Sequence, residues 1–239
     1  MKRVFTIDLL KVLALVNMIV YHGLWDMIYI FGTVKCDLYT LPFIIWERYI
    51  CISFIFLSGM CAYLSKNPLI SGAKVFLAGL IVTAVTLIFM PENAVVFGVL
   101  TLIGSCGIIL GLLKRHIVKI PPYVGFFGCI ILFVLLYDIS GGSIFFGKLP
   151  VKSLPFLKYP QAFLGLPVTD FRSTDYFPVF PWIFVYLSGF FLSNAIHPIS
   201  KPVKKGFQTA ISFISKHCLL IYLLHQPVIY VILDITKKL

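Results

Sequence analysis

The sequence has few charged residues for its length. Only 12% of its 239 residues are Asp, Glu, Lys or Arg, whereas 60% are hydrophobic. This balance lies far outside that of soluble globular domains, so we predict one membrane domain over residues 1–239. Acidic residues are the scarcest, with 9 against 20 basic ones. Basic residues that flank membrane spans explain this positive charge, and we predict no nucleic-acid partner.

Signatures of metal and phosphate sites are also missing. The sequence contains no Cys/His spacing typical of zinc, no glycine-rich phosphate loop and no Gly-x-Ser-x-Gly elbow. Its six cysteines have no paired spacing. Five of them lie in apolar runs, where Cys behaves as a small hydrophobic residue. We therefore predict neither a disulfide framework nor a metal site.

Apolar runs long enough to span a bilayer recur about seven times. We expect an all-α polytopic helix bundle with spans near residues 5–30, 44–64, 72–90, 94–113, 118–138, 176–196 and 217–236. The stretch from about 139 to 175 is too broken for a span and favours an outer lid or re-entrant segment, or else a surface loop without chemistry. Residues 206–215 are amphipathic and favour a helix along the membrane interface.

Basic residues gather on one side of these spans. The short connectors of the other side hold mainly Lys35 and Arg48. The positive-inside rule places the more basic side in the cytoplasm. We therefore expect a multi-pass protein of the cell membrane with its N-terminus in the cytoplasm and its C-terminus outside. The basic residues on the cytoplasmic side are Lys2, Arg3, Lys66, Lys74, Lys114, Arg115, Lys119, Lys201, Lys204, Lys205 and Lys216.

The first span carries a stripe of polar residues. At about 100° per residue, Asp8, Lys11, His22 and Asp26 fall within about 60° of one another around the helix, whereas Asn17 lies off the stripe. Ionisable groups inside a membrane usually face the protein interior or a water-filled cavity. The stripe therefore predicts the wall of a functional pocket.

His22 is the strongest candidate for chemistry. It lies about 25 Å along the helix from Phe5, in the outer third of the membrane, and Asp26 follows one turn later. A carboxylate beside an imidazole can fix its tautomer, so we expect Asp26 to orient a catalytic His22 and Asp175 to complete the site. The alternatives are a solvated histidine at a helix end and an Asp175 paired with Arg172. The candidate acceptor-binding residues are Trp25, Arg48, Arg172, Trp182, His225 and Gln226.

Several segments are similar to one known family. Asp8-x-x-Lys11 and His22-Gly23-Leu24-Trp25-Asp26 resemble the opening of the heparan-alpha-glucosaminide N-acetyltransferase catalytic domain family, in its short bacterial form. Lys11 stands where the wider group of membrane acyltransferases often has arginine, and Thr101 where many relatives have histidine. The other similar segments follow in the same order, at residues 54–59, 97–104, 175–182 and 215–227.

The resemblance implies a membrane acetyltransferase. An acetyl group would pass from cytoplasmic acetyl-CoA to an amine or hydroxyl of a glycan or amino sugar outside, with His22 as the catalytic residue and the bacterial cytoplasmic membrane as the location. Charge and position select Arg3, Asp8, Lys11 and Arg115 as the residues near acetyl-CoA. The rival interpretations are a transporter or small-solute channel that uses the polar stripe, and a non-catalytic membrane partner. A homo-oligomer is left open.

Overall fold

The computed structural model is almost entirely helical and describes residues 4–152, 157–198 and 205–238. Within these residues, seven helical segments are long and apolar enough to cross a membrane. Each corresponds to one of the predicted spans, so the all-α polytopic architecture and the multi-pass membrane location are confirmed. The segments are Phe5–Ile30, Leu41–Leu64, Pro68–Phe89, Val99–Ile117, Pro122–Gly141, Val179–Ile196 and Cys218–Lys238.

The fourth span begins at Val99, later than the predicted residue 94. The residues before it form a non-helical bend, in which Val96 N donates to Ser173 Oγ at 2.9 Å and Phe177 N donates to Phe97 O at 2.9 Å. Phe97 also has φ +57°, which a right-handed helix does not allow. Apolar composition alone did not reveal these contacts with a distant part of the chain.

The chain groups into two compact units. One comprises Ile55–Pro198, and the other comprises Lys2–Phe54 together with Ile199–Leu239. Helix α2 (Leu41–Leu64) begins in the second of these units and ends in the first.

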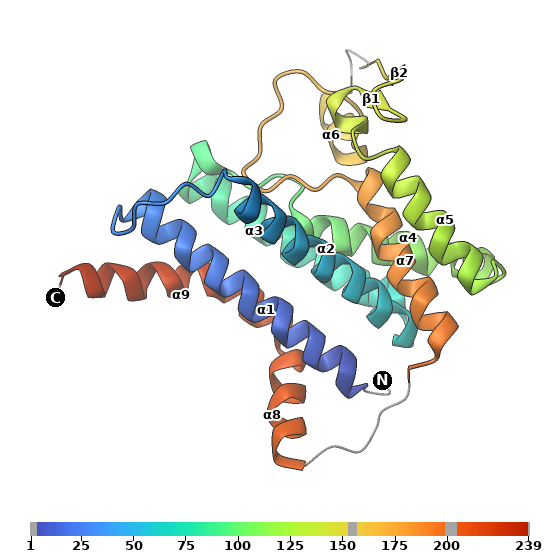
Figure 1. The fold of residues 1–239 in the computed structure, drawn as a ribbon, viewed down its shortest axis with the longest axis horizontal. Coiled ribbons are helices and arrows are strands. Elements are labelled where there is room, and N and C mark those ends of the chain that lie inside the picture. Colours follow the sequence, from blue (N-terminus) through green and yellow to red (C-terminus); the bar gives the residue numbers. More distant parts are fainter. Residues whose placement is uncertain (1–3, 153–156, 199–204, 239) are drawn as a thin grey trace. The chain divides into compact units, whose positions relative to one another are not determined.

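The unit of residues 55–198 is built around tightly packed helices. Helix α3 (Pro68–Phe89) packs on α4 (Val99–Ile117), and both α4 and α5 (Pro122–Leu135) pack on α7 (Val179–Ile196) (Figure 1). A short 3-10 turn, Pro91–Asn93, joins α3 to the non-helical segment before α4.

Glycines allow these helices to approach closely. A Cβ added at Gly104 of α4 would lie 2.4 Å from Phe76 N of α3, and one added at Gly189 of α7 would lie 2.0 Å from Phe56 O of α2. Such distances leave no room for a side chain, as expected where small residues mediate packing between membrane helices. The same holds at Gly59, Gly79 and Gly107, where an added Cβ would lie less than 3 Å from atoms of a neighbouring helix.

The segment between Gly141 and α7 contains no membrane-spanning helix among its described residues, as predicted. The 3-10 turn Ile139–Gly141 precedes two short antiparallel strands, β1 (Ser143–Ile144) and β2 (Leu149–Pro150). Helix α6 (Lys158–Leu164) then contacts α7.

The other unit is organised around the first helix. Helix α1 (Phe5–Trp25) continues into a π-helical turn, η1 (Asp26–Ile30), and contacts both α8 (Lys205–Lys216) and α9 (Cys218–Lys238) (Figure 1). Helix α8 confirms the amphipathic helix predicted for residues 206–215.

Helices α1 and α9 run parallel. Leu15 and Met18 of α1 pack with Ile221 near the start of α9, whereas Phe31, just after η1, lies 5.4 Å from Tyr230 between ring centroids. The contacts therefore advance along both helices in the same direction, from one membrane face to the other.

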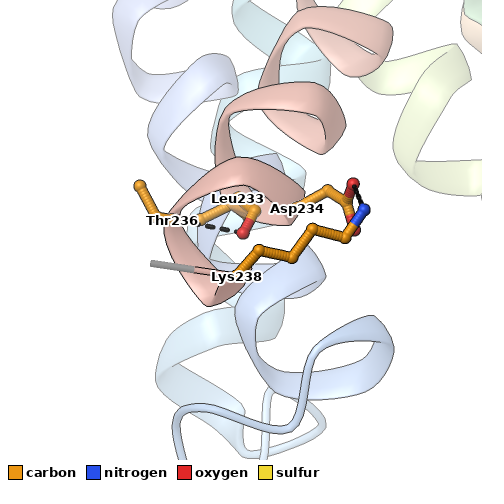
Figure 2. Close-up of polar contacts among 4 residues, drawn as sticks. All are labelled: Leu233, Asp234, Thr236 and Lys238. Carbon is orange, nitrogen blue, oxygen red and sulfur yellow. Dashed lines mark hydrogen bonds and ion pairs between the residues drawn. The ribbon is translucent and has the colours of Figure 1, made fainter.

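Polar contacts close the last turns of α9. Lys238 Nζ lies 2.6 Å from Asp234 Oδ2, and Thr236 Oγ1 donates to Leu233 O at 2.9 Å (Figure 2). The ion pair has the i,i+4 spacing that stabilises a helix. It is exposed, so it contributes little to stability.

Candidate functional site

Two polar pairs connect the first and last spans. The rings of His22 in α1 and His225 in α9 have centroids 4.8 Å apart and planes inclined by 61°. Asp26 lies one turn after His22, at the start of η1, and its Oδ1 accepts a hydrogen bond from Gln226 Nε2 of α9 at 2.7 Å. The parallel packing of α1 and α9 thus brings together four polar residues, two from the predicted stripe and two from the His-Gln-Pro segment.

Asp26 begins the π-helical turn. Phe31 N donates to Asp26 O at 2.9 Å, an i to i+5 hydrogen bond that replaces the usual i to i+4 bond. The Asp26 side chain is fully buried, with 0% exposed. Single π-helical turns inside α-helices are rare and frequently occur at functional sites. This turn places a carboxyl group directly against α9.

Pro227 lies inside α9, directly after His225 and Gln226, and removes one backbone hydrogen bond of this helix. Proline has no N–H and therefore cannot donate to the carbonyl four residues earlier, that of Leu223. In the turn before it, His225 Nδ1 is hydrogen-bonded to Tyr222 O. The side chain of His225 is thus held by the backbone of its own helix.

Three atoms of these pairs have no hydrogen-bond partner among the described residues. They are Asp26 Oδ2, His225 Nε2 and Gln226 Oε1, and all three are buried. An unsatisfied buried polar group costs about 1–3 kcal/mol, so proteins rarely keep several together. Such a group of open atoms is what a site for a polar ligand would present.

Asp26 was expected to orient His22, and the hydrogen bond found at its Oδ1 comes from Gln226. Sequence analysis did not anticipate this partner. One sequence feature did point to a parallel course of these two helices. The number of predicted spans is odd, so the first and last spans must cross the membrane in the same direction. It does not indicate which residues meet.

The other end of the stripe contacts α8. Asp8 is buried and accepts from Ser215 Oγ at 2.7 Å and from Ser212 Oγ at 3.1 Å. Lys11 Nζ donates to Ser215 O at 3.1 Å. This carbonyl lies in the last turn of α8, where backbone oxygens lack helical partners and a cation is favoured. Asp8 and Lys11 thus fix α8 against α1.

Asn17 joins α1 to α2, a contact that sequence analysis missed. Its Nδ2 donates to Leu13 O at 2.9 Å, and its Oδ1 accepts from Trp46 Nε1 at 3.0 Å. Asn17 lies off the polar stripe, and this contact to another helix accounts for a polar group at that position.

In the unit of residues 55–198, Asp175 precedes α7 in the sequence, and its side chain contacts the first residue of α4. Its Oδ2 accepts from Val99 N at 3.2 Å, one of the backbone donors that a helix N-terminus leaves open. Trp182 is a core residue with 5% of its surface exposed, and its ring lies 5.3 Å from that of Phe133 and 5.0 Å from that of Phe177.

Tyr176, next to Asp175, is held by a hydrogen bond to α6. Its hydroxyl donates to Ala162 O at 2.7 Å. Burial raises the pKa of this hydroxyl. Tyr176 therefore ties the segment before α7 to helix α6.

The family model described as heparan-alpha-glucosaminide N-acetyltransferase, catalytic, matches residues 3–227. The chain belongs to this family. The matched region contains both polar pairs, since His22, Asp26, His225 and Gln226 all lie within it. The protein is thus a multi-pass member of a family of membrane acetyltransferases. Membership in this family implies transferase activity. No curated protein and no solved structure matches the chain.

None of the described contacts of the other candidate residues in this family member is with the two polar pairs, although Trp25 directly precedes Asp26 in the sequence. Trp25 is half-buried, with its ring 5.3 Å from that of Tyr29, and Arg48 is half-buried in α2. Arg115, in the last turn of α4, and Arg172 are exposed. Arg3 lies outside the described residues.

Proposed function

We propose that this protein transfers an acetyl group from acetyl-CoA in the cytoplasm to an amine or hydroxyl of a sugar outside the membrane. The family match supports the transferase class. The observation that carries the site is the contact of His22 with His225, beside buried polar atoms that have no hydrogen-bond partner among the described residues. In this proposal residues 1–239 are one transmembrane acetyltransferase domain.

His22 is the catalytic residue of this reaction. Attack on a thioester requires the acceptor to lose a proton and the leaving sulfur to gain one. An imidazole can do both near neutral pH, because its ordinary pKa lies there. Asp26 and Asp175 contribute carboxyl groups to the outer site. The acceptor-binding set is Trp25, Arg48, Arg172, Trp182, His225 and Gln226.

Acetyl-CoA is held on the cytoplasmic side. Lys11 supports this assignment, because an ammonium group has three donors and the bond to Ser215 O uses one of them. Arg3 and Arg115 add positive charge for the CoA phosphates. Asp8 contributes by accepting from Ser212 and Ser215, which fixes α8 beside Lys11.

The direct test is the His22→Ala variant of the full chain, purified and reconstituted in liposomes. With acetyl-CoA as donor and glucosamine as probe acceptor, we expect acetyl transfer to fall by about 10²–10⁴-fold, the usual contribution of a general acid–base group. A His197→Asn variant is the matched control. His197 lies at the end of α7 with φ +42°, a conformation that Asn tolerates, and is expected to keep its activity.

The rival assignment as a transporter makes a different prediction. It requires solute flux into liposomes without any acyl-CoA, whereas the transferase requires acetyl-CoA and releases CoA. Acetyl-CoA must also raise the thermal unfolding midpoint of the folded protein, since a ligand that binds only the native state stabilises it. Undiminished transfer by His22→Ala would remove His22 from the mechanism, and no thermal shift at saturating acetyl-CoA would count against the donor.

A further inference from the structure

His225 has one ring nitrogen engaged and the other open. Its Nδ1 is hydrogen-bonded to Tyr222 O. A carbonyl oxygen can only accept, so Nδ1 must be the nitrogen that carries the proton. In a neutral imidazole the lone pair then belongs to Nε2. The backbone of α9 thereby selects the tautomer in which Nε2 is the basic atom.

The open nitrogen lies among other acceptors. His225 Nε2 is buried and has no hydrogen-bond partner among the described residues, and the same holds for Gln226 Oε1 and for the carboxyl oxygen Oδ2 of Asp26. Gln226 directs its amide nitrogen to Asp26, which fixes its oxygen as the open atom. A group that satisfies acceptors must bring N–H or O–H donors.

Only one of the two substrates brings such a donor at its reacting atoms. The acetyl thioester has a carbonyl oxygen and a sulfur there, and neither carries hydrogen. The nucleophile, an amine or a hydroxyl, does carry hydrogen. The open atoms of α9 and η1 therefore fit the acceptor substrate rather than the acetyl donor.

We propose that His225 Nε2 is the base that takes the proton from the acceptor during acetyl transfer. This inference rests on the proposed function and assigns one of its proton transfers to a second histidine. The acceptor nitrogen or oxygen bonds to the thioester carbonyl carbon while its proton passes to His225 Nε2. The bond from carbon to sulfur breaks, the sulfur leaves with the electron pair, and protonated His22 supplies its proton.

The contact between the rings completes the cycle. After transfer His225 holds an extra proton and His22 has lost one, so a single proton must move from His225 to His22. Their ring centroids are 4.8 Å apart on adjacent helices, which is close enough for one bridging water to carry this proton. The net reaction consumes acetyl-CoA and the acceptor and yields the acetylated acceptor and CoA.

Two substitutions of His225 distinguish the proposed base, Nε2, from the hydrogen bond that Nδ1 makes to Tyr222 O. His225→Asn keeps an amide N–H near the position of Nδ1, able to donate to Tyr222 O, but has no basic nitrogen. His225→Gln places a neutral amide near the position of Nε2. Leu224→Ala, at an adjacent exposed residue of α9, is the control. Each full-length protein is assayed in liposomes with acetyl-CoA and glucosamine.

We expect kcat of the Asn and Gln variants to fall by about 10²–10⁴-fold. The KM for acetyl-CoA and the thermal shift that it produces should stay at wild-type values, which a general loss of structure would not allow. Leu224→Ala should keep its kcat. A kcat within threefold of wild type in His225→Asn or His225→Gln would overturn this inference. The proposed function is tested separately by His22→Ala. A wild-type protein without acetyl-CoA-dependent transfer would refute the proposed function itself.

Discussion

Gln226 and Asp26 form a buried hydrogen bond whose loss should be measurable as stability. Replacing Gln226 by Leu leaves Asp26 Oδ1 without its donor, and we expect the free energy of unfolding to fall by about 1–3 kcal/mol. Replacing both partners by Leu should recover most of this loss, because no buried acceptor is then left without its donor. Thermal unfolding in detergent measures each variant. A double variant less stable than Gln226→Leu would contradict this account of the pair.

Single residues were predictable where one helix determines their position. His22 and Asp26 could be selected because helical periodicity places them on one stripe with Asp8 and Lys11. The partners of these residues could not be selected, because periodicity within one helix does not say which helix packs against it. The bond from Gln226 to Asp26 also depends on the π-helical turn, a local change of pitch that the apolar pattern does not show.

Helices α3 and α4 depend on glycine for their close packing. A Cβ at Gly104 would lie 2.4 Å from Phe76 N, a backbone atom that cannot move alone. We expect Gly104→Ala to lower the free energy of unfolding by about 1–3 kcal/mol through overpacking. Gly128→Ala in α5 is the matched control, since an added Cβ there meets nothing within 4 Å. Comparing their unfolding midpoints tests the assignment, and equal midpoints would argue against it.

Whole elements were easier to predict than their ends. Length and apolar composition determine a membrane helix, because every backbone polar group inside a bilayer must be satisfied within the helix. Helix α8 was predicted from a different signal, its amphipathic pattern. The start of α4 was misplaced because Val96 and Phe97 are apolar but bond to Ser173 and Phe177, far along the chain.

At the scale of the whole molecule, the direction of insertion into the membrane decides which side binds acetyl-CoA and which side binds the acceptor. Seven spans among the described residues place the two ends of the chain on opposite sides of the membrane. The parallel course of α1 and α9 agrees with this, since both must cross in the same direction. Charge bias predicts that His22 lies toward the outside and Lys11 toward the cytoplasm.

Cysteine labelling tests this orientation. Cys36 is exposed in the connector between η1 and α2, so a membrane-impermeant maleimide should label it in intact cells. In a Cys36→Ser background, a cysteine introduced by Lys66→Cys lies in the exposed connector before α3 and should be labelled only after the membrane is permeabilised. Cys36→Ser alone gives the baseline for cysteines within the spans. Labelling of Lys66→Cys in intact cells would invert the topology, and with it the sides assigned to acetyl-CoA and the acceptor.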